Sequence, residues 1–189
     1  MPAAPRPTTV DSAMTGRTKK PPAAAQPRPR GKRVFTLQVA ILAGPMTDRF
    51  VRKNPVISRT FEARGDHSLA DFHYAIFNAF DREDEHLYEF QLGGKRPMDP
   101  KARRYGLPVA MVDPFGDRDG SANAERTTLD SLGLATGYVF GYWFDFGDDW
   151  WHQIEVLAIA AGAPRGRLPK LTGRVGESPP QYIDWDAEE

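Results

Sequence analysis

The chain has 189 residues, with 26% charged and 40% hydrophobic residues and a formal net charge of zero, which is the composition of one soluble globular domain. It contains no cysteine, which excludes a disulfide framework, a cysteine-ligated zinc site, a thiol nucleophile and an iron–sulfur cluster. The first apolar run, Val34 to Ala43, is too short to span a bilayer and is misplaced for a signal peptide. We therefore expect a cytoplasmic protein without a membrane segment.

Residues 1 to 32 are rich in Pro, Ala, Arg and Lys and carry almost no large apolar side chains. Because burial cannot offset the ordering entropy of such a segment, we predict a disordered basic arm. Residues 1 to 33 hold eight Lys or Arg and one acid, whereas the remainder holds 17 basic and 24 acidic residues. The arm is either a solubilising tail or a salt-sensitive contact for nucleic acid or an acidic protein. The contact hypothesis names these cations: Arg28, Arg30, Lys32 and Arg33.

Two extended segments open the body of the protein. Val34 to Leu42 alternates in polarity and ends at Gly44-Pro45, and Val56 to Ala63 is a second, less regular strand. The apolar side of the first strand holds Phe35, Leu37, Val39 and Ile41. We expect the two strands to pair as a hairpin with a long connection.

The strongest helix signal follows. Ser68 and Asp71 have the spacing of a capping box, and apolar residues then recur at helical spacing. The predicted buried face contains Leu69, Phe72, His73, Ile76, Phe77 and Phe80. The acidic run from Asp81 to Glu85 ends this helix and leads to a third strand, His86 to Leu92, with His86 on its apolar side.

Residues 93 to 126 show no sustained period and read as a long excursion. A loop of that length is functional, mobile, or contains an element that the pattern does not reveal. Its first half is basic, through Lys95, Arg96, Lys101, Arg103 and Arg104. The segment Thr128 to Gly133 predicts one capped helical turn that is closed by glycine.

Two aromatic runs, Tyr138 to Phe146 and Trp150 to Leu157, predict a closing β-hairpin. A three-residue loop, Gly147 to Asp149, collects the apolar set on one face and places His152 opposite Phe144. We expect most of the tryptophans to be core residues. The alternative is a stacking platform for bases, formed by Trp143, Trp150 and Trp151.

The predicted organisation is a basic arm (1–32), an α+β domain (33–160) and an irregular Gly/Pro-rich, acidic C-terminal tail (161–189). Within that tail, Trp185 with Tyr182 and Ile183 is expected to dock on the body. The domain reads as ββαβ, a long loop and ββ, in a mixed sheet with one main helix packed on it. A β-grasp-like arrangement is the specific expectation.

Three of the four histidines, His73, His86 and His152, fall on predicted core-facing positions. One hypothesis is a divalent metal site, with zinc as the first choice, to which Asp145 or Asp148 adds an oxygen ligand. The other is that each histidine is structural and bonds to backbone carbonyls or nearby acids. The chain has no GxGxxG, Walker-type, GxSxG or HExxH motif, so no other cofactor is expected.

Two stretches together carry a family resemblance: LADFHYAIFNAFDREDEHLYEF, from Leu69 to Phe90, and FGYWFDFGDDWWHQIEV, from Phe140 to Val156. They are similar to the Ri-plasmid (pRiA) ORF-three-like family, over roughly Val34 to Ala158. The matching positions are Phe72-His73, His86-Leu87, Tyr142, Phe144, Asp145, Phe146, Gly147, Asp148, Trp150 and His152.

The chain departs from this family at two places. Many members have Gly-Trp where this chain has Asp81-Arg82, and they have a Trp-Arg-Arg segment in the second strand that is missing here. The resemblance implies a compact α+β domain. Some relatives are passenger proteins of bacterial plasmids or insertion elements, so it also implies a non-enzymatic binding or accessory protein. A metal-dependent hydrolase that uses the three histidines is the alternative.

Overall fold

The structure is a computed structural model that describes residues 33–107, 112–113, 116–117, 122–162 and 169–183. The predicted arm, including Arg28, Arg30 and Lys32, lies outside the described residues, as does Trp185.

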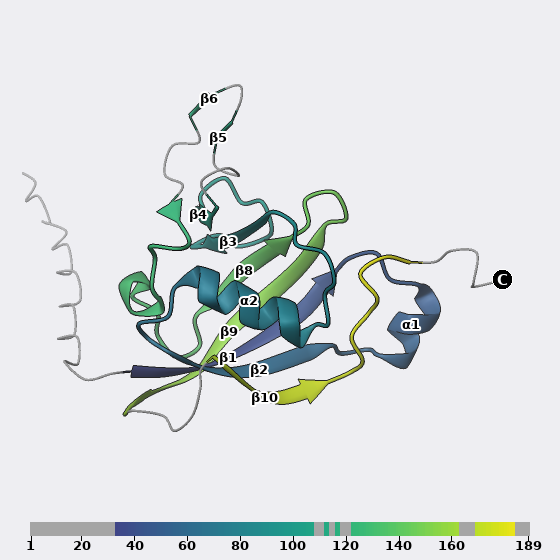
Figure 1. The fold of residues 1–189 in the computed structure, drawn as a ribbon, viewed down its shortest axis with the longest axis horizontal. Coiled ribbons are helices and arrows are strands. Elements are labelled where there is room, and N and C mark those ends of the chain that lie inside the picture. Colours follow the sequence, from purple (N-terminus) through teal and green to yellow (C-terminus); the bar gives the residue numbers. More distant parts are fainter. Residues whose placement is uncertain (1–32, 108–111, 114–115, 118–121, 163–168, 184–189) are drawn as a thin grey trace, which may run out of the picture.

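One mixed sheet dominates the described part of the chain, with its strands in the order β10-β2-β1-β9-β8-β3-β4-β7 (Figure 1). Every neighbouring pair is antiparallel except β4 and β7, which are parallel. The strands are β1 (Arg33–Ala43), β2 (Ser58–Arg64), β3 (Tyr88–Leu92), β4 (Arg103–Gly106), β7 (Ala122–Asn123), β8 (Val139–Phe144), β9 (Trp150–Ala161) and β10 (Lys170–Val175).

One helix, α2 (Leu69–Ala79), lies across one face of this sheet (Figure 1). The smaller elements are α1 (Asp48–Lys53), the 3-10 turn η1 (Leu129–Leu132), and the separate two-stranded pair of β5 (Val112–Asp113) and β6 (Gly116–Asp117). The α+β class, the mixed sheet and the one main helix are confirmed, and the β-grasp-like arrangement is roughly consistent with the topology. No helix in the described ranges is long and apolar enough to cross a membrane.

The core lies between α2 and the sheet. The Ser68–Asp71 capping box forms as predicted, and Phe72 and Ile76 are buried beneath the helix. The Phe72 ring meets the Phe61 ring of β2 edge to face, with centroids 5.5 Å apart. The predicted pairing of the first two strands is also confirmed, although α1 occupies part of their connection.

A buried cation, Arg59, joins the end of α2 to the C-terminal segment. Its Nε donates to the Ala79 carbonyl at 2.9 Å, and its Nη1 donates to the Val175 carbonyl at 3.0 Å. Its Nη2 donates to the Ser178 hydroxyl at 2.8 Å, and the guanidinium lies 4.8 Å from the centre of the Phe80 ring. Arg59 therefore satisfies a carbonyl at the helix end that has no partner within the helix.

The predicted register of the closing hairpin is wrong by two residues. His152 lies opposite Tyr142, and Phe144 lies opposite Trp150, so the loop has five residues, Asp145–Asp149. Asp145 has φ 55°, and its Oδ1 accepts the Gly147 N–H at 3.1 Å, which closes the longer loop. The faces are preserved because the slip is an even number of residues.

The predicted start of the third strand is also wrong. Pairing with β8 begins at Tyr88, opposite Phe144, which is the last residue of β8. The residues before Tyr88 extend beyond the end of β8, where the Asp145 N–H bonds to the Leu87 carbonyl. His86 is consequently outside the strand, with 37% of its side chain exposed.

Two segments whose sequences predict irregular structure contain strands. The excursion from residue 93 supplies β4 and β7, and the tail after residue 160 supplies the edge strand β10. These strands are short or exposed on both faces, so their sequences lack the alternation that a half-buried strand shows.

Candidate functional site

Two regions contain the residues that the sequence singled out. The first is the layer between α2 and the sheet, where most residues of the resemblance lie. The second is the opposite face of the sheet, where a groove and three stacked aromatic rings lie.

In the buried layer, His73 of α2 and Tyr142 of β8 form a hydrogen bond, with 2.7 Å between Nδ1 and the phenolic oxygen. The Tyr88 ring stacks on the imidazole at a centroid distance of 3.6 Å. Burial lowers the pKa of His73 to about 3 and raises that of Tyr142, so both groups are neutral at pH 7. This pair joins the helix to the sheet.

His152 lies on the same buried face, between the rings of Tyr142 and Phe80 at 5.1 Å and 5.3 Å. Neither of its ring nitrogens has a hydrogen-bond partner among the described residues. Burial, and secondarily the Arg82 charge, lowers its pKa to about 3. The backbone of Trp150 and Tyr142 near the ring opposes this shift only weakly. His152 is therefore a neutral core residue.

Asp81-Arg82 occupies the position at which resembling proteins have Gly-Trp. Asp81 has φ 53°, a left-handed conformation that favours glycine, and its carboxylate accepts the Ser178 hydroxyl at 2.6 Å. The Arg82 guanidinium lies 3.7 Å from the centre of the Trp150 ring, and burial lowers its pKa to about 10. The arginine here covers Trp150, which is fully buried.

His86 is in a different neighbourhood from the other two histidines. Its Nε2 lies 2.9 Å from the Tyr182 hydroxyl and 3.4 Å from Asp145 Oδ2, and Tyr182 donates to Asp84 Oδ2 at 3.1 Å. Gln181, which is buried, accepts the backbone N–H of Glu83 at 2.8 Å. The C-terminal segment thus docks on the loop after α2, as predicted for Tyr182.

The three histidines do not form a common site. Within the part of the chain that the structure describes, no three His, Asp or Glu side chains are grouped so that they could hold a metal ion. His73 bonds to Tyr142, His86 bonds to the C-terminal segment, and His152 lies among aromatic rings. The arrangement gives the three-histidine zinc hypothesis no support. The expected contact with an acid is found for His86 and Asp145, whereas His73 bonds to a phenol and His152 has no hydrogen-bond partner among the described residues.

The resemblance residues of the hairpin also have structural roles. Trp150 fills the core and requires Gly44, because a Cβ at that position would lie 2.2 Å from the tryptophan ring. The N–H groups of Gly147 and Asp148 both bond to Asp145 Oδ1, at 3.1 Å and 3.4 Å. The signature therefore builds the hairpin and its contact with α2.

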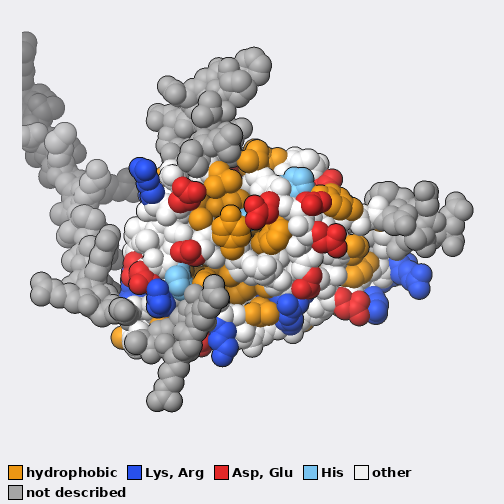
Figure 2. Space-filling model, in the orientation of Figure 1, with side chains coloured by type: hydrophobic (Ala, Val, Ile, Leu, Met, Phe, Trp, Pro, Cys, Tyr) orange, Lys and Arg blue, Asp and Glu red, His pale blue; other side chains and the backbone are white. Residues whose placement is uncertain are grey.

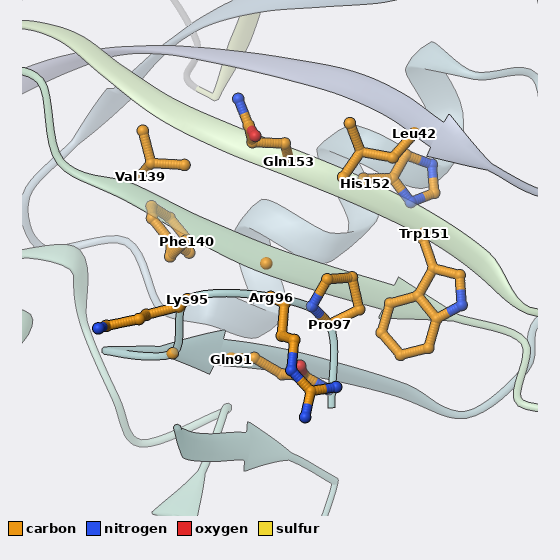
Figure 3. Close-up of a pocket in the computed structure, with 12 residues that line it drawn as sticks. Leu42, Gln91, Lys95, Arg96, Pro97, Val139, Phe140, Trp151, His152 and Gln153 are labelled. Carbon is orange, nitrogen blue, oxygen red and sulfur yellow. The ribbon is translucent and has the colours of Figure 1, made fainter. Parts of the chain in front are cut away.

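The opposite face of the sheet is hollowed by a groove of about 100 Å³ (Figure 3). Its floor is the outward side of β8 and β9, and its rim is the loop that follows β3. Of the labelled residues, Arg96, Pro97 and Trp151 lie around the same opening (Figure 3). The lining consists of Leu42, Gln91, Gly94, Lys95, Arg96, Pro97, Val139, Phe140, Gly141, Trp151, His152 and Gln153.

An aromatic stack stands beside this groove. The Trp143 and Trp151 rings are a cross-strand pair with centroids 4.6 Å apart and planes inclined by 10°. The Phe146 ring covers the other side of Trp143 at 4.0 Å. All three side chains are half-buried, and Trp151 lines the groove. The five-residue loop is what moves Phe146 from its predicted core face to this stack.

The rim loop is held in place by buried polar groups. Gln91 Oε1 accepts the Met98 N–H at 2.9 Å, and Gln91 Nε2 donates to Glu89 Oε1 at 2.8 Å. Asp99 accepts the backbone N–H of Lys95 at 3.0 Å. The side chains of Lys95 and Arg96 are exposed, and neither makes a hydrogen bond or ion pair with another described residue.

Sequence reasoning found the parts of this second region without placing them together. The expectation that most of the tryptophans are core residues is wrong for two of the three described ones: Trp150 is buried, but Trp143 and Trp151 alternate with the core residues of their strands and face outward. Their stacking and the position of the basic loop over the strands depend on tertiary contacts. Among the predicted contacts for nucleic acid, Arg33 is described, and its Nε donates to Asp130 Oδ1 at 2.6 Å.

A family model described as plasmid pRiA4b ORF-3-like protein matches residues 49–184, which includes β10 and most of the C-terminal segment. A crystal structure of a protein of unknown function, MM3350 from Methanosarcina mazei Go1, has a similar fold, with a TM-score of 0.59. Its sequence is 21% identical, and the match covers 80% of this chain and 74% of that one. No curated protein matches the chain.

Proposed function

Since the chain belongs to the plasmid pRiA4b ORF-3-like family, whose description names no reaction, we propose that it is a non-enzymatic binding protein. The proposed binding site is the groove on the open sheet face together with the ring of Trp151. One observation carries the proposal: Trp151, whose ring stacks on that of Trp143, lines the same groove as Lys95 and Arg96, on the sheet face opposite α2.

The residues of the groove favour planar ligands with negative charge. Trp143 stacks on one side of the Trp151 ring, and no other aromatic ring of the described residues stacks on Trp151. Lys95 and Arg96 supply positive charge at the rim, and Gln153 supplies an exposed amide on the floor. A groove of about 100 Å³ is much smaller than the roughly 300 to 1,000 Å³ of enclosed ligand pockets. The ligand would therefore lie on the surface, with only part of it in the groove.

The chemistry of the lining supports binding more than acid–base catalysis. Its charged residues are both cations, and no carboxylate is part of it. The imidazole of His152 belongs to the opposite, buried face, where it is neutral and surrounded by aromatic rings. Neither the two cations nor His152 is arranged as a nucleophile with an adjacent base.

An accessory role in plasmid or mobile-element biology fits the family description. We propose that Arg28, Arg30 and Lys32 of the basic arm add a salt-sensitive electrostatic contact with nucleic acid or an acidic protein. Since the ion pair with Asp130 occupies Arg33, that residue would contribute less than the other three.

The probe that tests the site is 8-anilinonaphthalene-1-sulfonate, an anion with a planar naphthalene ring. We expect its fluorescence to rise on binding the full chain, and Trp151→Ala and Arg96→Ala to weaken that binding about tenfold. Matched controls are Tyr74→Ala, an exposed aromatic on α2, and Arg49→Ala, an exposed cation on α1. Binding that depends on Tyr74 and not on Trp151 would disprove the open-face site.

A further inference from the structure

We infer that the ligand of the open face is single-stranded nucleic acid, an inference that rests on the binding site proposed above. Three features lead to it: an aromatic stack that borders the groove at Trp151, exposed cations at the groove rim, and neighbouring carboxylates that are held by hydrogen bonds.

The stack offers a place where an unpaired base continues an existing column of rings. Phe146, Trp143 and Trp151 follow one another at centroid distances of 4.0 Å and 4.6 Å, with nearly parallel planes. The end of this column at Trp151 borders the groove. Every nucleobase has a flat face of suitable size, so such a site tolerates any sequence.

The charges near the stack favour a chain of phosphates. Lys95, Arg96 and Lys101 are exposed, and their side chains make no ion pair with another described residue. The carboxylates close by are already used: Asp99 accepts the N–H groups of Lys95 and Lys101, at 3.0 Å and 2.9 Å. Asp149 accepts the Trp143 indole N–H at 2.9 Å. Both carboxylates keep their negative charge, and Asp99 attracts Arg96 and Lys101, so the local excess of these three cations over the two acids is one positive charge.

Glu89 would otherwise be the strongest objection to an anionic ligand. This carboxylate is buried, and its Oε1 accepts from Arg104 Nη1 at 3.0 Å and from Gln91 Nε2 at 2.8 Å. Its charge is balanced by Arg104, and its second role is to hold Gln91, which binds the rim loop through the Met98 N–H. Glu89 thus supports the loop that presents Arg96.

The α2 face of the molecule is unsuited to such a ligand. In Figure 2, hydrophobic side chains gather over α2 and the adjoining strands with Asp and Glu side chains among them, while Lys and Arg lie toward the periphery. The exposed aromatic of α2, Tyr74, has no cation of the described residues stacked on it. An anionic polymer would meet repulsion there, so the open face is the one that fits it.

A duplex would use this site poorly. Paired bases are stacked inside the helix and cannot reach the Trp151 ring, so a duplex contacts only the cations. Single strands expose both the base faces and the phosphates. The geometry therefore predicts preference for a single strand, and for unpaired bases of either DNA or RNA.

The experiment measures binding of fluorescein-labelled dT12, U12 and a 12-base-pair duplex to the full chain by anisotropy, at several salt concentrations. We expect both single strands to bind more tightly than the duplex, and Trp151→Ala to lower their affinity about tenfold, with Trp151→Phe restoring most of it. Arg96→Ala should reduce the salt dependence by about one released counterion. Tyr74→Ala and Arg49→Ala are the matched controls.

The basic arm needs its own control, because it could bind any polyanion. A full-length variant with Arg28, Arg30 and Lys32 changed to Gln should keep the dependence on Trp151 while it loses part of the salt dependence. Equal affinity for heparin, duplex and single strand, unaffected by Trp151→Ala, would overturn the inference.

The naphthalene sulfonate probe distinguishes failure of the open-face site from failure of nucleic acid as its ligand. If dT12 or U12 displaces the bound probe, the inference is supported. If the probe binds through Trp151 and Arg96 but neither oligonucleotide displaces it, the open-face site stands and nucleic acid is rejected as its ligand. If the probe itself does not bind there, the site and the inference both fail.

Discussion

The side chains of His73 and Tyr142, which are 69 positions apart in the sequence, share a buried hydrogen bond of 2.7 Å that joins the only long helix of the described structure to the sheet. Both groups are neutral, because burial keeps the imidazole unprotonated and the phenol protonated. The bond is therefore sensitive to the loss of either partner.

Tyr142→Phe should lower the free energy of unfolding by about 1 to 3 kcal/mol, because it leaves the buried Nδ1 of His73 without a partner. Urea denaturation followed by circular dichroism measures this loss. Tyr74→Phe, at an exposed position on α2, is the matched control and should change stability by less than about 0.5 kcal/mol. Equal effects of the two substitutions would show that the His73 bond contributes nothing.

Acidification should destabilise the fold well above the pH at which carboxylates titrate. The pKa values of His73 and His152 are about 3 in the folded protein against 6.5 for an ordinary histidine, so between these values the unfolded chain binds more protons. Stability therefore falls as pH drops from about 6.5 toward 3, by about 1.4 kcal/mol per pH unit for each histidine. Unfolding measured at pH 7, 6 and 5 tests this slope.

His73→Leu should remove its own share of that pH dependence, about 1.4 kcal/mol per pH unit, whatever it does to stability at pH 7. His67, whose pKa is lowered by burial, contributes in the same direction and stays in this variant. A slope that is unchanged in this variant would mean that His73 is accessible to protons in the folded state.

Arg59→Lys should destabilise the protein by about 2 kcal/mol although it retains the charge. The guanidinium bonds to the Ala79 and Val175 carbonyls and to Ser178, and one ammonium group cannot reach all three. Thermal unfolding checks this, with Arg49→Lys on the exposed side of α1 as the control. A loss no greater than that of the control would contradict the role assigned to Arg59.

Gln181→Ala should loosen the C-terminal segment while the rest of the fold stays intact. The buried amide accepts the N–H groups of Glu83 and Asp84 and donates to the Asp84 carbonyl, at 2.8, 3.1 and 3.0 Å. We expect faster limited proteolysis between residues 176 and 183, with a smaller change in the unfolding midpoint. Cleavage at the wild-type rate would show that other contacts hold the segment.

The elements that were predictable from sequence are those whose signals are local. The capping box and apolar face of α2, the alternation of β1 and the turn closed by Gly133 depend on nearby residues, and each formed as expected. The hairpin register was not predictable from polarity, because both loop lengths place the same residues on the core face. The left-handed conformation of Asp145 and its carboxylate bonds decide between them.

The candidate site also has features that local sequence predicts and features that depend on tertiary contacts. Outward-facing Trp143 and Trp151 follow from the phase of their strands, whereas the overhang of Lys95 and Arg96 depends on Met98, which has φ 57°, and on its bond to Gln91. The core-facing positions of His73 and His152 could be read from the sequence, but whether the histidines converge could not, because convergence depends on tertiary contacts. Each imidazole in fact bonds or packs within its own neighbourhood.

The position of β10 has a consequence for how molecules of this protein meet. An edge strand with free N–H and C=O groups invites a second chain to extend the sheet. Here the ladder is interrupted between Leu171 and Gly173, and Lys170 and Arg174 place charge along the same border. A regular incoming strand would lose register at the interruption. If that strand were β10 of a second molecule, the basic side chains of the two copies would repel each other. This border of the sheet is therefore protected against edge-to-edge aggregation.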